Sequence, residues 1–110
     1  MSDAFEFYRG MLTNLGLITG DGDFKIIEKE DRNLIVEAVN CSFQHICKYI
    51  QQKNYLDPFG RMSCLRGISF ASAIETITEE TVDAELKEFN PSKCVFEIKA
   101  GSINFFQFFL

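Results

Sequence analysis

The spacing of apolar residues changes its period along this chain, and that change limits the possible folds more than any other feature of the sequence. Over residues 4–15 the apolar side chains recur every three or four positions, which is typical of one face of an amphipathic helix. The same spacing returns over 42–53 and again over 64–78. The sequence therefore predicts three helices, each with one face that needs to be covered. In the second helix, the predicted apolar face carries Phe43, Ile46, Cys47 and Ile50.

Elsewhere apolar and polar residues alternate, as they do in strands with one buried face. A short polar connection joins the alternating segments 24–28 and 34–39, and a turn at 90–93 joins 82–87 to 94–99. Each pair of segments predicts an antiparallel hairpin. The order helix, hairpin, two helices, hairpin predicts an α+β fold, in which two antiparallel β-hairpins form one sheet with about three helices packed on it.

The number of phenylalanines bears on how the chain assembles. A length of 110 residues fits a single domain, 1–110, and a domain of this size buries only about two-thirds of its unfolded surface. Twelve Phe side chains exceed what one such core can hide, so we expect a homodimer. The C-terminal tail, 101–110, is largely apolar, and we expect it to cover a neighbouring core or to add a strand to a partner.

The charge and the N-terminal segment exclude several classes of partner. The net charge is −5, with 16 acidic residues against 11 basic ones, which argues against nucleic acid and anionic membranes as partners. The N-terminal segment has neither a basic region nor a long apolar stretch, so the sequence predicts no secretory signal and no membrane span. We therefore expect a cytoplasmic protein whose thiols stay reduced.

Four cysteines carry the most specific chemistry in the chain. Thiolates of Cys41, Cys64 and Cys94, which come from two predicted strands and a helix start, could converge on one zinc ion. Cys47 or His45 would complete a four-ligand site. No C-x-x-C spacing occurs, which excludes a thioredoxin motif and a zinc ribbon. The alternative is that the cysteines are small core residues, and we expect this of Cys47, which lies within an apolar stripe.

Cys64 has a further expected property. It lies near a predicted helix N-terminus, with Arg61 and Arg66 nearby in the sequence. The helix dipole and these two cations are expected to lower the pKa of its thiol and make it more reactive. That reactivity also requires access to solvent.

Catalysis and ligand binding leave weaker marks on the sequence. His45 is the only histidine, and no acid or nucleophile stands at an interpretable spacing from it, so we expect no enzymatic activity. The helix predicted over 64–78 is rich in small residues, which would let a sheet, a sister helix or a flat apolar ligand approach closely. If a ligand binds there, the pocket is expected to be lined by Gly67, Phe70, Ala71 and Ile74.

Three short motifs carry a resemblance to a known family: Asn40-Cys41-Ser42, Cys64-Leu65-Arg66-Gly67 and Cys94-Val95-Phe96-Glu97-Ile98. The segment around them, 35–99, resembles the 4-vinyl reductase domain family, whose small domains are often described as binding hydrocarbons or other small molecules. The resemblance implies an α/β fold related to haem-nitric-oxide-binding and trafficking-complex domains. It also implies cysteines that bind a metal or respond to redox state. Phe89 stands in the neighbourhood where the family often has a further Cys.

Together these patterns predict a non-catalytic regulatory domain that binds a small apolar molecule or a metal ion such as zinc, or responds to the redox state of its thiols. The alternative is a structural or protein-interaction module that forms a homodimer or a hetero-complex and buries its cysteines as core. A metal- or ligand-binding domain gains thermal stability when it is loaded, whereas the stability of an interaction module depends on protein concentration.

Overall fold

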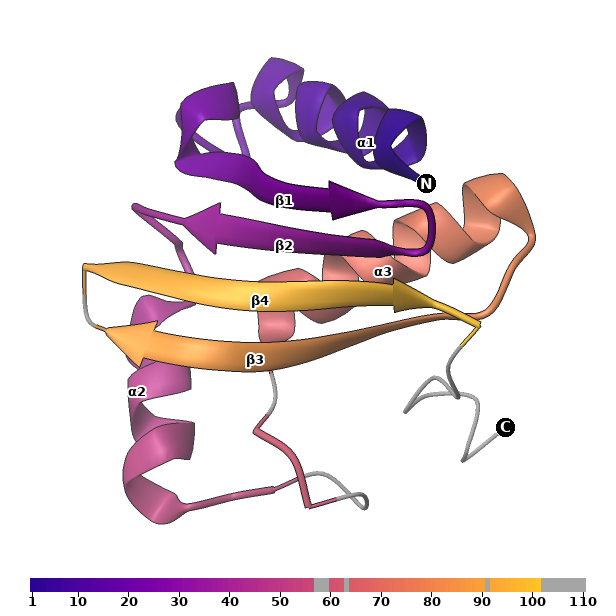
Figure 1. Ribbon diagram of the computed structural model, residues 1–110. Helices are drawn as coiled ribbons and strands as arrows, with labels where there is room; N and C mark the ends of the chain where they lie inside the picture. Colours follow the sequence, from indigo (N-terminus) through magenta and orange to yellow (C-terminus); the bar gives the residue numbers. More distant parts are fainter. Residues whose placement is uncertain (57–59, 63, 91, 102–110) are drawn as a thin grey trace.

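The computed structural model describes residues 1–56, 60–62, 64–90 and 92–101, and it contains a four-stranded antiparallel sheet with helices against one face (Figure 1). The predicted α+β class is confirmed, as are the two antiparallel hairpins within one sheet. In chain order the elements are α1 (Ser2–Asn14), the 3-10 turn η1 (Asp21–Asp23), β1 (Phe24–Glu30), β2 (Asn33–Ala38), α2 (Gln44–Lys53), α3 (Leu65–Thr78), β3 (Val82–Asn90) and β4 (Lys93–Ala100).

The two hairpins are joined edge to edge, which gives the strand order β1-β2-β4-β3. β2 and β4 form the central antiparallel pair, in which Val36 lies opposite Phe96 and Ala38 lies opposite Cys94. Central strands have neighbours on both sides, and the inward side chains of Val36 and Phe96 are fully buried. This pairing brings together two parts of the chain that lie far apart in the sequence.

α3 lies against the inner face of the sheet, and its small residues explain how closely it packs. A Cβ atom at Gly67 would lie 3.1 Å from the Phe96 ring and 3.3 Å from the Cβ of Ala84. The absence of a side chain at this position lets the helix backbone approach β3 and β4. The small residues of α3 were expected to admit a sheet, a sister helix or a flat ligand, and in the structure they pack on the sheet.

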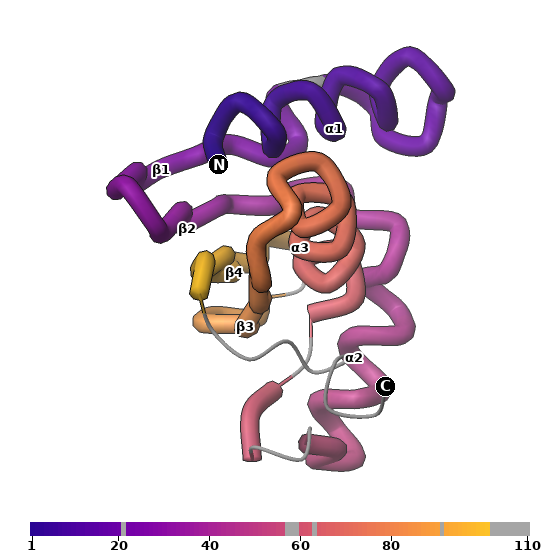
Figure 2. Tube along the Cα trace, turned by 90° about the vertical axis from the view of Figure 1, so that its right-hand side faces the viewer, coloured from indigo at the N-terminus to yellow at the C-terminus, as the bar shows by residue number. Residues whose placement is uncertain are grey.

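α1 packs against α3 and lies beside β1 (Figure 2). The Phe70 ring of α3 is the centre of the aromatic core: its centroid lies 4.5 Å from that of Phe5, 5.4 Å from that of Phe24 and 6.2 Å from that of Phe96. All four rings are fully buried or almost so. In contrast, Phe7 on the outer side of α1 is 67% exposed, so the core does not take up every phenylalanine.

α2 lies apart from the other helices, at the end of the sheet where β2 ends and β4 begins (Figure 1). Cys47 is its only buried residue. The helix predicted over 42–53 is confirmed, and so is the burial of Cys47, but the apolar face is only partly covered, since Ile46 is 52% exposed. The face stays partly open because α2 lies off the end of the sheet and not on its face.

Most of the predicted apolar tail, 102–110, lies outside the described residues, so its role stays a prediction. The homodimer, for which the tail is one reason, also stays a prediction. In the described part of the chain, no helix is both long enough and apolar enough to cross a membrane.

Candidate thiol site

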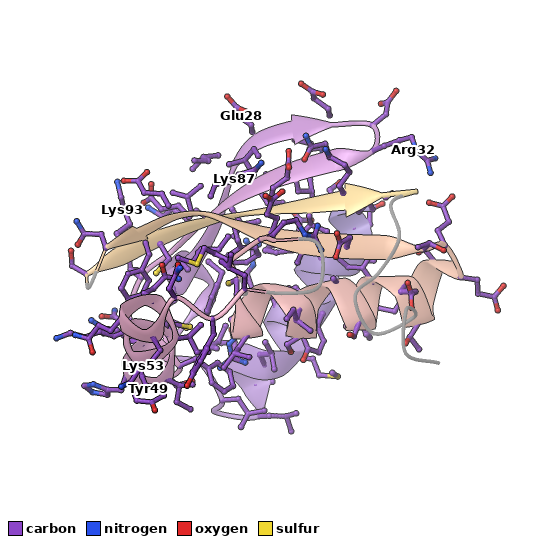
Figure 3. All side chains as sticks on the ribbon, turned by 90° about the horizontal axis from the view of Figure 1, so that it is seen from below. Glu28, Arg32, Tyr49, Lys53, Lys87 and Lys93 are labelled. Carbon is purple, nitrogen blue, oxygen red and sulfur yellow. The ribbon has the colours of Figure 1, made fainter. Side chains whose placement is uncertain are left out.

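Four separate segments bring the cysteine side chains to one end of the fold. They come from the loop after β2, from α2, from the residue before α3 and from the start of β4: Cys41, Cys47, Cys64 and Cys94. All four are free thiols. Sulfur atoms gather where α2 meets the end of the sheet (Figure 3). The three predicted zinc ligands and the reserve Cys47 therefore share one region.

The thiols are close enough to act on one another electrostatically. Burial raises the pKa of Cys64 to about 12, although a backbone hydrogen bond from Gly67 lowers it, and the other three thiols raise it further. Burial is also the main reason why the pKa values of Cys47 and Cys94 are raised, and a charge on Cys41 would raise both further. The thiols of Cys47, Cys64 and Cys94 therefore keep their protons at neutral pH.

Backbone N–H groups at the start of α3 are directed at two of the sulfur atoms. Cys64 is the N-cap of α3, and its Sγ accepts a hydrogen bond of 3.3 Å from the N–H of Gly67. Burial raises the pKa of Cys47, and a backbone hydrogen bond from Leu65 partly offsets this effect. At the N-cap of α3, the sulfur of Cys64 thus takes the role that a Ser or Asp oxygen usually has. Such donors stabilise negative charge on sulfur, which is the charge of a thiolate ligand.

The expectation that Cys64 is a reactive thiol of low pKa is wrong. Its side chain is buried between α3 and the sheet, and desolvation of the charged form outweighs the helix dipole. The two nearby cations point elsewhere, because Arg61 pairs with Asp83 and the guanidinium of Arg66 donates to Ser42. At neutral pH the Cys64 thiol therefore keeps its proton.

Cys41 and Cys94 border a small hollow between the loop after β2 and the β3–β4 turn. Its volume is about 10 Å³, which is room for one water-sized occupant. Its other lining residues are Ala38, Asn40, Gln44, Ser92 and Lys93. Both cysteines are half-buried, so a small ion can reach them from solvent.

The donor set suits a soft metal ion in its chemistry, but it is not gathered around one point. Zinc binds sulfur at about 2.3 Å and nitrogen at about 2.0–2.1 Å, in a tetrahedron of four donors. Across 1–56, 60–62, 64–90 and 92–101, no three His, Cys, Asp or Glu side chains are arranged to hold a metal ion. Binding would therefore draw the sulfur atoms together, and α2 is the element best able to move because it buries only Cys47.

The other reserve ligand, His45, is exposed on α2. It lies two positions before Cys47, so the two side chains point to nearly opposite sides of the helix, roughly 160° apart. The described geometry therefore directs His45 away from the thiols.

The four residues expected to line a ligand pocket are all buried between α3 and the sheet: Gly67, Phe70, Ala71 and Ile74. Protein atoms already fill the space beside this helix, since a Cβ at Gly67 would contact Phe96, Cys64 and Ala84. An apolar ligand on this face would have to displace core side chains.

One polar residue in the first turn of α3, Arg66, is not among the site residues that the sequence predicts. Arg66 is only 7% exposed, although arginine is rarely buried without a partner. Its guanidinium lies 4.7 Å from the Phe43 ring centroid and 5.8 Å from that of Phe24. The signal that could have found it is an arginine in the first turn of a helix whose other residues there are apolar or small.

No protein-family model, curated protein or solved structure matches this chain at a significant level. The resemblance to the 4-vinyl reductase family therefore stays a prediction that rests on the motifs around Cys41, Cys64 and Cys94. Function has to be inferred from the geometry and chemistry of the site itself.

Proposed function

We propose that this chain is a non-catalytic regulatory domain that binds zinc, or a metal ion of similar softness, through its cysteine thiols. The observation that carries the proposal is that four thiols from four separate segments lie at one end of the fold, near enough to raise one another's pKa values. The ligands would be Cys41, Cys64 and Cys94, with Cys47 as the fourth.

Zinc with four sulfur ligands has no open position, so it would act as a cross-link and not as a catalyst. It would tie the loop after β2, α2, the start of α3 and the start of β4 to one another. α2 would gain most, because a helix of ten residues that buries only Cys47 has little other tertiary support. Zinc would thus control how firmly α2 is held, and a partner could sense that difference.

Two features favour a metal site over plain core packing of the cysteines. Cys41 and Cys94 are only half-buried and border a hollow, whereas free cysteine that serves only packing is usually fully buried. In addition, two backbone N–H groups at the start of α3 are directed at the two buried sulfur atoms, where they would stabilise thiolate charge.

A metal ion is favoured over a small apolar ligand because the helix face proposed for that ligand is occupied. Phe70 and Ile74 are fully buried in the core, and no gap is left beside Gly67. A ligand would have to pay for opening this core, whereas a metal ion would replace only the protons of the thiols.

Anaerobic native mass spectrometry of the protein titrated with zinc tests the proposal. We expect one zinc per chain, and we expect Cys64→Ser and Cys94→Ser each to abolish or strongly weaken its uptake. Serine also serves well as an N-cap, so Cys64→Ser should keep α3 folded, which circular dichroism would check. His45→Gln is the matched control and should bind zinc like the wild type. A mass that stays metal-free at every zinc concentration would contradict the proposal.

A second candidate function, protein interaction, is favoured by the outer face of α1. Phe7, Met11 and Leu15 follow one another at intervals of four residues and are exposed, Phe7 by 67% and Leu15 by 65%. Together with Gly10, these side chains line an open groove of about 480 Å³ along the helix. An exposed apolar row next to a groove is typical of a protein-interaction surface.

We propose a second copy of this chain as the occupant of that surface. In an antiparallel pair of α1 helices the apolar row of each copy would lie in the groove of the other, so the surface is complementary to itself. A typical stable interface buries about 800 Å² of surface on each partner, and three exposed side chains provide much less. We therefore expect a weak dimer, whose population depends on protein concentration.

A further inference from the structure

Arg66 is a buried cation without an anionic partner among the described residues. Its side chain is 7% exposed, and Nη2 donates a hydrogen bond of 2.8 Å to the Oγ of Ser42. Its Nε is buried and has no hydrogen-bond partner. None of the ion pairs in the described part of the chain includes this guanidinium.

The position of Arg66 makes a missing counter-charge costly. It is the second residue of α3, a helix of 14 residues, and the N–H dipoles of the first turn place partial positive charge there. This first turn contains no acidic residue. The rings of Phe24 and Phe43 contact the cation, but the attraction of a ring face is weak and does not replace an oxyanion. A charge that is buried without a counter-charge destabilises the fold.

The chain does not lack carboxylates that could have paired with Arg66. It has 16 acidic residues against 11 basic ones. Elsewhere on the fold two buried carboxylates form ion pairs, Asp83 with Arg61 and Glu97 with Lys87. The unpaired state of Arg66 is therefore a property of this place in the fold.

A second guanidinium contacts the same phenylalanine. Arg9 of α1 donates from Nη1 to the carbonyl oxygen of Phe24 at 2.9 Å. Its Nε is also buried without a partner, and none of the ion pairs in the described ranges includes it. Two guanidinium groups around Phe24 raise the positive potential in a protein that is acidic as a whole.

We propose that Arg66 and Ser42 form a binding site for a small oxyanion, that is, for a phosphate or carboxylate group. A planar guanidinium offers a fork of N–H donors that matches two oxygen atoms of such a group, and its Nε is still without an acceptor. Ser42, whose hydroxyl would be the second donor, is an exposed residue, so the site lies at the surface on this side. The half-buried Phe43 ring forms an apolar wall beside it.

This site adjoins the thiol site, since Ser42 follows Cys41 and Arg66 lies two residues after Cys64, but it uses different side chains. The guanidinium is turned toward Ser42 and Phe43, and the proposed anion contacts need no zinc. Zinc uptake and anion binding are therefore measured independently, each with its own ligand.

Titration of the whole chain with inorganic phosphate and, separately, with acetate tests the proposal. Sodium chloride at equal ionic strength controls for screening. The side-chain Nε–H resonance of Arg66 in ¹H–¹⁵N spectra reports on the site directly, and we expect a saturable shift with at least one of the two anions. A response to phosphate alone indicates a phosphate ligand, and a response to acetate alone indicates a carboxylate ligand. No saturable response to either anion overturns the proposal.

Variants separate this site from general charge effects. Arg66→Met removes the guanidinium and keeps an unbranched side chain, and it should weaken anion binding at least about tenfold. Arg32→Met removes an exposed arginine of the same charge and should bind like the wild type. Ser42→Ala should weaken binding to a smaller extent and leaves all charges in place. Equal anion-dependent stabilisation of the wild type and Arg66→Met overturns the proposal. If Arg66→Met does not fold, the wild-type resonance and Ser42→Ala decide.

Discussion

The backbone N–H of Gly67 donates a hydrogen bond of 3.3 Å to the Sγ of Cys64, so α3 begins with a sulfur cap. The same glycine lies so close to the sheet that a Cβ atom there would be 3.1 Å from the Phe96 ring. Packing of α3 on the sheet and the chemistry of the thiol site therefore depend on one backbone position.

Gly67→Ala should destabilise the fold, although alanine is the better helix former by about 1 kcal/mol. The new Cβ would lie 3.1 Å from Phe96 and 3.3 Å from Ala84, neither of which can move away easily. Overpacking of this kind costs about 1–3 kcal/mol, so we expect a net loss of about 1 kcal/mol in the free energy of unfolding. Urea denaturation measures it. Gly10→Ala, which has nothing within 4 Å, is the control and should be stabilising at protein concentrations low enough to keep the chain monomeric. A Gly67→Ala protein at least as stable as the wild type would refute close packing at this position.

Ionisation of the Cys64 thiol should destabilise the fold in alkali. Its pKa is raised from 9.0 to about 12 by burial, so the folded state holds the proton more tightly than the unfolded state does. Its contribution is complete below pH 9.0 and is lost as the pH rises toward 12, by up to roughly 4 kcal/mol in all. Cys64→Ser has no thiol to ionise, so its free energy of unfolding should fall less between pH 8 and about pH 10.5. Parallel urea curves at several pH values provide the measurement, and identical pH profiles for both proteins would count against this burial.

Protonation of the Glu97 carboxylate should destabilise the fold in acid. Burial raises the pKa of its carboxyl, but the hydrogen bond from Asn33 and the charges of Lys87 and Lys99 outweigh burial, so the net pKa lies below 4.5. A lowered folded-state pKa stabilises the fold above the unfolded value, and that contribution disappears as the pH falls. Glu97→Gln should cost about 1–2 kcal/mol at pH 7 and lose less than the wild type on going to about pH 3.

The matched control for the acid prediction is Glu28→Gln. Glu28 is exposed on the edge strand β1, where its side chain points into solvent (Figure 3). We expect its denaturation midpoint to follow that of the wild type at each pH. If Glu97→Gln behaved like this control, the ionised Glu97 would contribute nothing to stability.

Zinc binding should strengthen steeply as the pH rises. The pKa values of Cys47, Cys64 and Cys94 are all raised, so each of these thiols must give up a proton to become a ligand. Below the thiol pKa values, the apparent affinity should increase up to about tenfold per pH unit for each thiol that ionises. Competition with a chelator of known affinity between pH 6 and pH 8 measures the slope. A zinc affinity that does not change with pH would exclude these thiols as ligands.

The α1 surface predicts a concentration-dependent dimer. Phe7→Ser and Leu15→Ser each remove one side chain from the exposed apolar row, and both should shift the protein toward the monomer in sedimentation velocity experiments. Ile77→Ser removes an apolar side chain of 48% exposure from α3 and should leave the association unchanged. A dimer that survives both α1 substitutions would place the interface elsewhere.

Local patterns were sufficient for most of the secondary structure. The three-and-four spacing over 64–78 predicts a helix that the structure places at Leu65–Thr78, and the alternation over 82–87 and 94–99 falls within β3 and β4. These predictions succeed because the period of apolar residues reflects which side of an element is buried, and this information lies within the element itself. The same pattern over 42–53 also predicts α2, at Gln44–Lys53, but it marks an apolar face without specifying what covers that face.

The sequence by itself determined the α+β class and named the thiols that could act together. Only the tertiary structure showed that Cys47 lies in the same region as Cys41, Cys64 and Cys94, because that placement depends on the pairing of β2 with β4 and on where α3 begins. It also reversed the expected pKa shift of Cys64 and left Arg66 buried without a carboxylate partner among the residues that the structure describes. The physical reason is the same in each case: desolvation and charge pairing depend on neighbours from distant parts of the chain, which residue spacing does not encode.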